Sequence, residues 1–162
     1  MTTPSVPTFA IVTGGGTAGH VLPALAIADA LVAAGTPPAA VHYVGAARGI
    51  EARLVPPTGY PMTLLPGRGI QRKLAVANLA AVGGLLVAAV RAIGLVRRLR
   101  PKVVVAVGGY ASVAVALAAV LWRVPVVVAE QNQAPGAANR LIARFAKASA
   151  VSFPGTDLPR AV

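Results

Sequence analysis

The sequence predicts an α/β fold in which a mostly parallel sheet carries helices on both faces. Three observations support this prediction. Short apolar runs alternate with longer helical segments along the chain. The run at residues 103–107 consists only of valine and alanine, as is typical of a strand buried on both faces. Glycine-rich turns follow the runs at residues 9–12 and 103–107 and lead into helical segments, which is the arrangement of repeated strand–helix units.

The elements are predicted in order from these patterns. Strands are expected at residues 9–12, 41–44, 62–65, 103–107, 125–129 and 148–153. Helices are expected at residues 21–34, 48–55, 74–99, 108–122 and 136–146. Such an alternation is Rossmann-like, and its loops after the strands meet at the carboxyl edge of the sheet, where these folds bind ligands.

The composition limits the possible functions. With 162 residues, one domain is expected. There is no cysteine, so disulfides, thiolate metal sites and a cysteine nucleophile are excluded. Fifteen basic residues against four acids give a net charge of +11, which favours an anionic partner. Nucleic acid is disfavoured, because no interleaving of aromatic and basic residues suggests base stacking.

A glycine-rich loop at residues 13–20 is the stretch around which the chain is organised. Gly14, Gly16 and Gly19 fit the spacing G-x-G-x-x-G between a strand and a helix. The amides of a helix N-terminus can bind an anion there, and His20 adds a titratable group. Pro23 is expected in the first helical turn, where its missing N–H is tolerated. The alternative is a tight turn without a ligand.

Two further clusters follow strands and compete with simpler interpretations. Residues 108–112 form a second candidate anion site at a helix N-terminus, or else a close turn. Residues 130–132 place three polar side chains after a strand, which is more than a helix cap needs. An NADP-type dinucleotide-binding domain remains a rival, since Arg48 could hold a phosphorylated ribose although the usual acid is absent. A P-loop is excluded, because no lysine follows these glycines.

Four motifs occur in an order that resembles one family. They are residues 14–20, residues 107–112, residues 129–132 together with 135–139, and residues 153–155. Together they resemble the MurG family, the N-acetylglucosaminyltransferases of peptidoglycan synthesis, over nearly the whole chain. Ala18 departs mildly from the family, many of whose members have glycine there. The family has two Rossmann-like halves in the GT-B arrangement. The resemblance implies that residues 1–162 are the N-terminal, acceptor-side domain, without the C-terminal donor-binding half.

The resemblance also implies an activity and a set of site residues. The reaction would move N-acetylglucosamine from UDP-N-acetylglucosamine to lipid I with inversion, giving lipid II, and this half alone would be inactive. His20 is the first choice for the base and Glu130 the second. Substrate contacts are expected from Thr17, Ala18, Gly19, Gly108, Gly109, Tyr110, Ser112 and Asn132. No metal and no cofactor is implied. A membrane-surface binding module without chemistry remains an alternative.

The uncharged run at residues 74–90 is predicted to be a surface helix rather than a transmembrane span. It is rich in alanine, contains Asn78 and ends at Arg91. The helical period predicts that one stripe packs on the sheet, namely Leu79, Val82, Leu86, Val90 and Ile93.

A basic row on another face of this helix is predicted to bind anionic lipid. With its flanking leucines and the preceding loop, the row comprises Arg68, Arg72, Lys73, Leu74, Leu85, Arg91, Leu95, Arg98 and Leu99. The simpler alternative is a solvated basic edge. Together with the lipid-linked acceptor, the row predicts a peripheral protein at the cytoplasmic face of the cell membrane.

Overall fold

The computed structural model describes residues 6–66 and 77–162, with side chains from residue 83 onward in the second range. In this part of the chain a six-stranded sheet runs in the order β3-β2-β1-β4-β5-β6, and every neighbouring pair is parallel. The strands are β1 (Ala10–Gly14), β2 (Val41–Ala46), β3 (Met62–Leu65), β4 (Val103–Gly108), β5 (Val126–Glu130) and β6 (Ala148–Val151). The predicted parallel α/β fold is confirmed.

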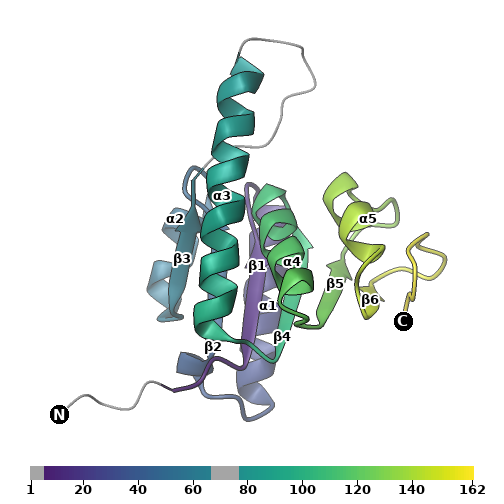
Figure 1. Ribbon diagram of the computed structural model, residues 1–162. Helices are drawn as coiled ribbons and strands as arrows, with labels where there is room; N and C mark the ends of the chain where they lie inside the picture. Colours follow the sequence, from purple (N-terminus) through teal and green to yellow (C-terminus); the bar gives the residue numbers. More distant parts are fainter. Residues whose placement is uncertain (1–5, 67–76) are drawn as a thin grey trace.

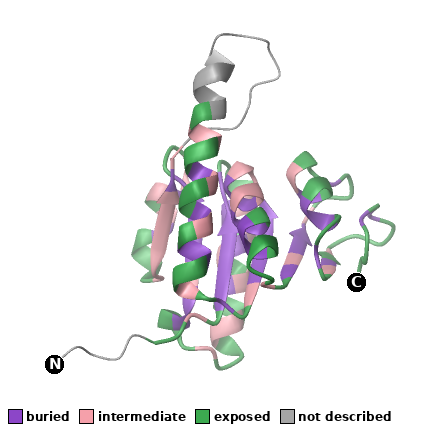
Figure 2. Ribbon diagram, in the orientation of Figure 1, coloured by how far each residue is buried: buried purple, intermediate pink, exposed green. Residues whose placement is uncertain are grey.

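Helices cover both faces of the sheet (Figure 1). The α-helices are α1 (Ala18–Ala33), α2 (Glu51–Leu54), α3 (Ala77–Leu99), α4 (Tyr110–Leu121) and α5 (Ala137–Ala143). Side chains of α1 share one apolar cluster with Val12, Tyr43 and Val107 of the sheet. Side chains of α3, α4 and α5 share the other cluster with residues such as Ile11 and Val104. Figure 2 shows the central strands buried between these two layers.

The strand order reverses between β1 and β4, and this reversal positions the candidate site. Both strands lie at the centre of the sheet, and Gly14 pairs with Gly108 at their carboxyl ends. The two glycine-rich loops that follow these strands are therefore neighbours, although 94 positions separate Gly14 from Gly108 in the sequence. Ligands of open α/β sheets bind in the crevice at such a reversal.

Helix α1 begins earlier than predicted, which changes the position of Pro23. The helix starts at Ala18 rather than at residue 21, so Pro23 lies in its second turn. The ring nitrogen of Pro23 cannot donate the usual bond to the carbonyl of Gly19. The sequence pattern missed this start because the first helical residues, Ala18 and Gly19, are small and carry no amphipathic signal.

The prediction of the buried face of α3 is wrong. Leu86 and Val90 are 65% and 70% exposed, whereas Ala88 and Ala92 are completely buried. Ile93 is only partly buried. Small alanine side chains let α3 approach α4 closely, and Leu86 and Val90 of the predicted stripe are left outside.

The other α3 predictions have mixed outcomes. Leu95, predicted to lie beside the basic row, is buried in the core, and Leu99 packs partly against it. Arg91 and Arg98 are exposed as expected. The predicted membrane residues Arg68, Arg72, Lys73 and Leu74, and the side chains of Leu79 and Val82, lie outside the described residues. Of the helices that the structure describes, none is both long and apolar enough to cross a bilayer.

Candidate functional site

The two glycine-rich loops touch through their backbones. The Gly15 N–H donates to the Gly108 carbonyl over 3.2 Å. A Cβ on Gly109 would lie 2.5 Å from the Gly15 carbonyl oxygen, so no larger residue fits there. The φ angle of Gly109 is +87°, which also favours glycine. Gly109 is thus required by the contact between the two loops.

His20 lies at the junction of the two loops, in the first turn of α1. Its Nδ1 is 3.2 Å from the Gly15 carbonyl oxygen and 3.3 Å from Thr17 Oγ1. A carbonyl oxygen can only accept a hydrogen bond, so the His20 tautomer that bonds to the Gly15 carbonyl carries its proton on Nδ1. The ring edge with Nε2 lies against Gly108, where a Cβ would be 2.7 Å from Nε2. The lone pair on Nε2 accepts no hydrogen bond from the described part of the chain.

A hollow of about 470 Å³ opens beside His20, a size typical of small-molecule sites. Its lining is largely apolar and includes Leu85 of α3 and residues from the N-terminal turns of α4 and α5. The lining residues are His20, Leu85, Gly108, Gly109, Tyr110, Val113, Gly136, Ala137, Ala138, Asn139 and Leu141. The structure therefore brings His20 together with three predicted substrate residues of the second loop. It also places Leu85, predicted as a membrane contact, at this hollow.

The first turn of α1 presents the amides predicted for anion binding. Thr17, Ala18 and Gly19 are exposed. The N–H groups of Ala18 and Gly19 come before the first intrahelical bonds, so they can donate to a ligand. The Gly16 N–H instead donates to the Glu51 carboxylate. Fewer backbone N–H groups of this loop are therefore available to an anion than the glycine motif suggests.

Tyr110 and Ser112 of α4 differ in what they offer. The Tyr110 hydroxyl donates to the Leu65 carbonyl over 3.1 Å. Burial raises the pKa of Tyr110, and the charge of Glu51 raises it further, so the phenol is a neutral donor at physiological pH. Ser112 is completely buried, and its hydroxyl lies 2.8 Å from the carbonyl oxygens of both Thr13 and Gly108. The predicted contact between Ser112 and a ligand is corrected: its hydroxyl supports the second loop from inside.

Glu130 at the end of β5 is 2% exposed and surrounded by donors. It accepts hydrogen bonds from the backbone of Asn132 and Gly136 and from the side chains of Asn132 and Asn139, at 2.9–3.0 Å. Burial alone would raise the pKa of Glu130, but these hydrogen bonds outweigh it and hold the pKa below its usual value. Asn132 itself is exposed, and the bond to Glu130 fixes its side chain.

Two residues of this region carried no predicted role. The buried side chain of Asn139 donates to the carbonyls of Val107 and Ala129, and so joins the ends of β4 and β5. Glu51 is completely buried under the first loop. The sequence feature that could have indicated this buried position is the pair of glycines at 45 and 49, which leave space for the Glu51 side chain. Within the described residues no group of histidine and acid side chains could hold a metal ion.

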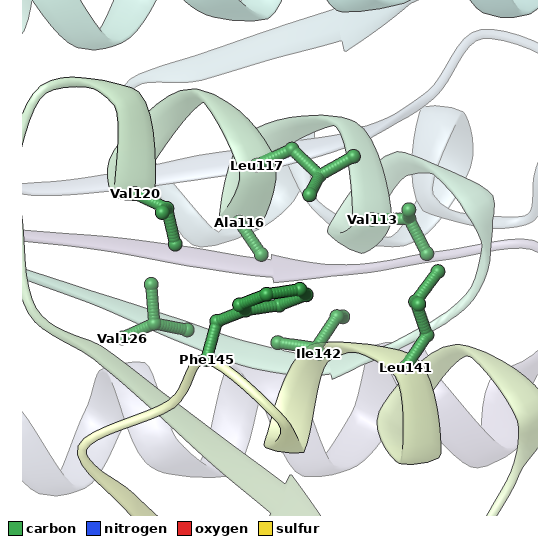
Figure 3. Close-up of a pocket in the computed structure, with 8 residues that line it drawn as sticks. All are labelled: Val113, Ala116, Leu117, Val120, Val126, Leu141, Ile142 and Phe145. Carbon is green, nitrogen blue, oxygen red and sulfur yellow. The ribbon is translucent and has the colours of Figure 1, made fainter.

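A second groove, between α4 and α5, has no polar group to offer (Figure 3). The Phe145 ring lies between the two helices and fills much of the space. The groove is lined by Val113, Ala116, Leu117, Val120, Val126, Leu141, Ile142 and Phe145. This groove therefore offers an apolar surface and no group that could act as a base.

The comparison with known families decides between the interpretations of this site. The model of the glycosyltransferase family 28 N-terminal domain matches residues 10–151. The chain belongs to glycosyltransferase family 28. The match covers both glycine-rich loops, Glu51 and residues 130–139, so it favours a glycosyltransferase over the NADP-type alternative.

Individual members of family 28 are similar over most of the chain. A relative from Desulforudis audaxviator is 45% identical over 147 residues, covering 88% of this chain and 38% of its own length. One from Nocardioides is 46% identical, covering 93% and 41%. Both are named UDP-N-acetylglucosamine--N-acetylmuramyl-(pentapeptide) pyrophosphoryl-undecaprenol N-acetylglucosamine transferase.

A solved structure gives the same result. MurG of Acinetobacter baumannii superposes with a TM-score of 0.79 at 31% identity, covering 96% of this chain and 46% of that one. The chain is thus a MurG-like N-terminal domain of GT-B type, and it spans about 40% of the length of the curated relatives.

Proposed function

We propose that this domain is the acceptor- and membrane-binding half of an inverting N-acetylglucosaminyltransferase that converts lipid I into lipid II. The observation that carries the proposal is the geometry of His20. Its Nδ1 is held by Gly15, and its Nε2 edge lies at a hollow between two helix N-termini. The names of the curated relatives support UDP-N-acetylglucosamine as the donor and the undecaprenyl-diphosphate-linked lipid I as the acceptor.

His20 is the base of the proposed reaction. The acceptor hydroxyl gives its proton to Nε2 while its oxygen forms a bond to the anomeric carbon of the donor sugar. The bond from that carbon to the diphosphate breaks, and the electron pair leaves with the diphosphate. Attack opposite the leaving group inverts the anomeric configuration.

The remaining site residues hold the substrates. The Ala18 and Gly19 amides, with Thr17, bind a diphosphate at the positive end of α1. Gly108, Gly109 and Tyr110 contact the acceptor, and Asn132 contacts a sugar. Glu130 fits positioning better than proton transfer, because both of its oxygens already accept bonds that organise the loop before α5. Since the chain spans only part of its relatives, the donor is bound mainly by the rest of the enzyme, and this domain alone is inactive.

The outer surface of α3 supports a place on the cytoplasmic face of the membrane. We define the α3 strip as the exposed side chains of Leu86, Val87 and Val90. Arg91 and Arg98 are exposed on the same helix. The neighbouring helix α4 adds Leu117 and Leu121, both about half exposed. Exposed apolar patches of this kind mark interaction sites, and basic residues beside them favour anionic lipid over a neutral surface.

Substitution in a full-length enzyme tests the base assignment. His20→Ala is expected to lower kcat by about 10²–10⁴-fold, because the acceptor hydroxyl loses its proton acceptor. Asn132→Ala is expected to act mainly on KM for the sugar. The measurement is transfer of radiolabelled N-acetylglucosamine to a lipid I analogue, with thermal unfolding as the control for folding.

Glu130→Gln distinguishes the two candidate bases. If Glu130 positions the loop before α5, this variant retains measurable turnover. Turnover near that of the wild type in His20→Ala, together with none in folded Glu130→Gln, would transfer the role of base to Glu130.

A further inference from the structure

Glu51 is a buried carboxylate with an unusual set of partners. It is the first residue of α2 and completely buried, and it forms no ion pair within the described chain. Its carboxylate accepts hydrogen bonds from two backbone groups instead, the N–H of Gly16 at 3.1 and 3.2 Å and the N–H of Ala46. A buried carboxylate without a cation is costly unless such bonds are in place.

Three glycines make room for this side chain. A Cβ on Gly15, Gly45 or Gly49 would lie 2.0–2.6 Å from atoms of Glu51, closer than any contact allows. These glycines come from the first loop, from β2 and from the turn before α2. Three separate positions therefore accommodate one carboxylate, which ties the end of β2 to the first glycine-rich loop.

One peptide group connects Glu51 to His20. The N–H of Gly16 and the carbonyl of Gly15 belong to the same peptide unit, and in a trans peptide they point in opposite directions. The N–H donates to Glu51, and the carbonyl accepts from Nδ1 of His20. The result is a chain of hydrogen bonds from carboxylate to peptide to imidazole, and each bond polarises the next.

We infer that Glu51 is a positioning residue that sets the tautomer and orientation of His20 through the Gly15–Gly16 peptide group. By fixing the peptide plane, it aims the Gly15 carbonyl at Nδ1 and leaves the lone pair on Nε2, facing the hollow. A carboxylate that contacts its histidine directly acts in the same way in hydrolase triads. The consequence for catalysis rests on the proposed role of His20, whereas the control of the tautomer does not.

Nitrogen-15 NMR of the histidine rings in the 162-residue chain tests the inference without substrates. The chain has only two histidines, and a His42→Gln variant assigns the signals of His20. In the wild type we expect the Nδ1–H tautomer of His20 and slow hydrogen exchange at the Gly16 amide. A wild-type His20 in the Nε2–H tautomer would overturn the inference before any substitution at Glu51.

Glu51→Gln is the decisive variant. A carboxamide carries no charge, and one of the two oxygens that Gly16 donates to is replaced by an NH₂ group, so the bond from the Gly16 N–H is weakened and is no longer charge-assisted. We expect the ratio of the Nδ1–H to the Nε2–H tautomer of His20 to fall about tenfold, the effect of losing one charge-assisted hydrogen bond. Glu51→Asp, which keeps the charge, is expected to restore part of the ratio. An unchanged ratio in folded Glu51→Gln would refute the inference.

Asp29→Asn is the matched control. Asp29 is also an acid and lies on α1, the helix of His20, but its carboxylate accepts from Tyr60 and not from the loop peptide. Asp29→Asn should leave the tautomer ratio of His20 unchanged. A tenfold fall in this variant as well would refute the inference, because the loss of any nearby negative charge would then have the same effect. If Glu51→Gln shifts the tautomer while kcat of the full-length enzyme is unaffected, the link from Glu51 to His20 stands and the role of His20 as base fails.

Discussion

Most polar side chains around the hollow already form hydrogen bonds within the protein. Ser112, Glu130 and Asn139 are buried and make hydrogen bonds that hold loops and strand ends together. His20 differs, because one ring nitrogen is held and the other lies at the hollow. This difference, rather than residue type, makes His20 the reactive group of the proposed site.

His42 gives a prediction about pH. The side chain is mostly buried on β2 and contacts Thr63 over 2.9 Å. Burial, together with the nearby charge of Arg98, lowers the pKa of His42 to about 4. Because the unfolded chain takes up this proton near pH 6.5 and the folded chain does not, stability falls as the pH drops from 6.5 towards 4.

The size of this effect is checked by urea unfolding at pH 7 and pH 4.5. The wild type should lose up to about 2 kcal/mol, a figure reduced for the partial exposure of the ring. His42→Gln keeps a polar contact for Thr63 but cannot take up the proton, so it should lose less. Equal losses in the two proteins would show that His42 is not responsible.

The positions of the candidate site residues were easier to predict from the sequence than their hydrogen-bond partners. Both glycine-rich loops, His20 and residues 130–132 were located because each follows a predicted strand and parallel strands end at one edge. The partners of Ser112 and Glu51 were not predictable, because Ser112 bonds to a residue 99 positions away and Glu51 to one 35 positions away. Such contacts depend on the register of β1 against β2 and β4, which local patterns do not specify.

At the level of whole elements, α3 shows where a helical pattern misleads. The stripe of large side chains defined a plausible inner face, yet the buried face begins with Ala88 and Ala92 and continues to Leu95 and Val96. A stripe drawn at helical spacing gives most weight to large apolar residues and cannot recognise close packing by small ones. The error has a functional consequence, because the observed orientation places Leu86 and Val90 on the outer surface of the helix that also exposes Arg91 and Arg98.

A matched pair of substitutions tests this orientation of α3. Ala92→Leu adds bulk to a completely buried position and should destabilise the domain by about 1–3 kcal/mol through overpacking. Val90→Leu adds bulk at a position that is 70% exposed and should change stability by less than about 0.5 kcal/mol. Denaturant unfolding measures both, and the opposite ranking would restore the face predicted from the sequence.

At the scale of the whole molecule, the candidate site and the proposed membrane surface lie on different parts of the domain. The carboxyl edge of the sheet carries the hollow, the start of α1 and the loop before α5. Helices α3 and α4 carry exposed apolar residues, and α3 also carries the exposed Arg91 and Arg98. Leu85 links these regions, since it lies on α3 and lines the hollow. A lipid-linked acceptor could therefore reach His20 from a membrane lying against α3.

Vesicle binding tests the membrane proposal on the domain as it stands. The chain should bind vesicles containing anionic phospholipid and be released by high salt, because each basic residue near the surface contributes about 1 kcal/mol that salt screens. Arg91→Gln with Arg98→Gln should weaken binding roughly tenfold or more, and Leu86→Ser with Val90→Ser should weaken it further by removing the apolar part of the α3 strip.

The matched control is Arg48→Gln with Arg53→Gln, which removes the same charge from exposed positions in α2 and in the turn before it. Sedimentation with vesicles measures all of these variants. If the control pair weakens binding equally, net charge explains the effect and the contact at α3 is contradicted. Binding to neutral vesicles as strong as to anionic ones would also contradict an electrostatic contact at α3.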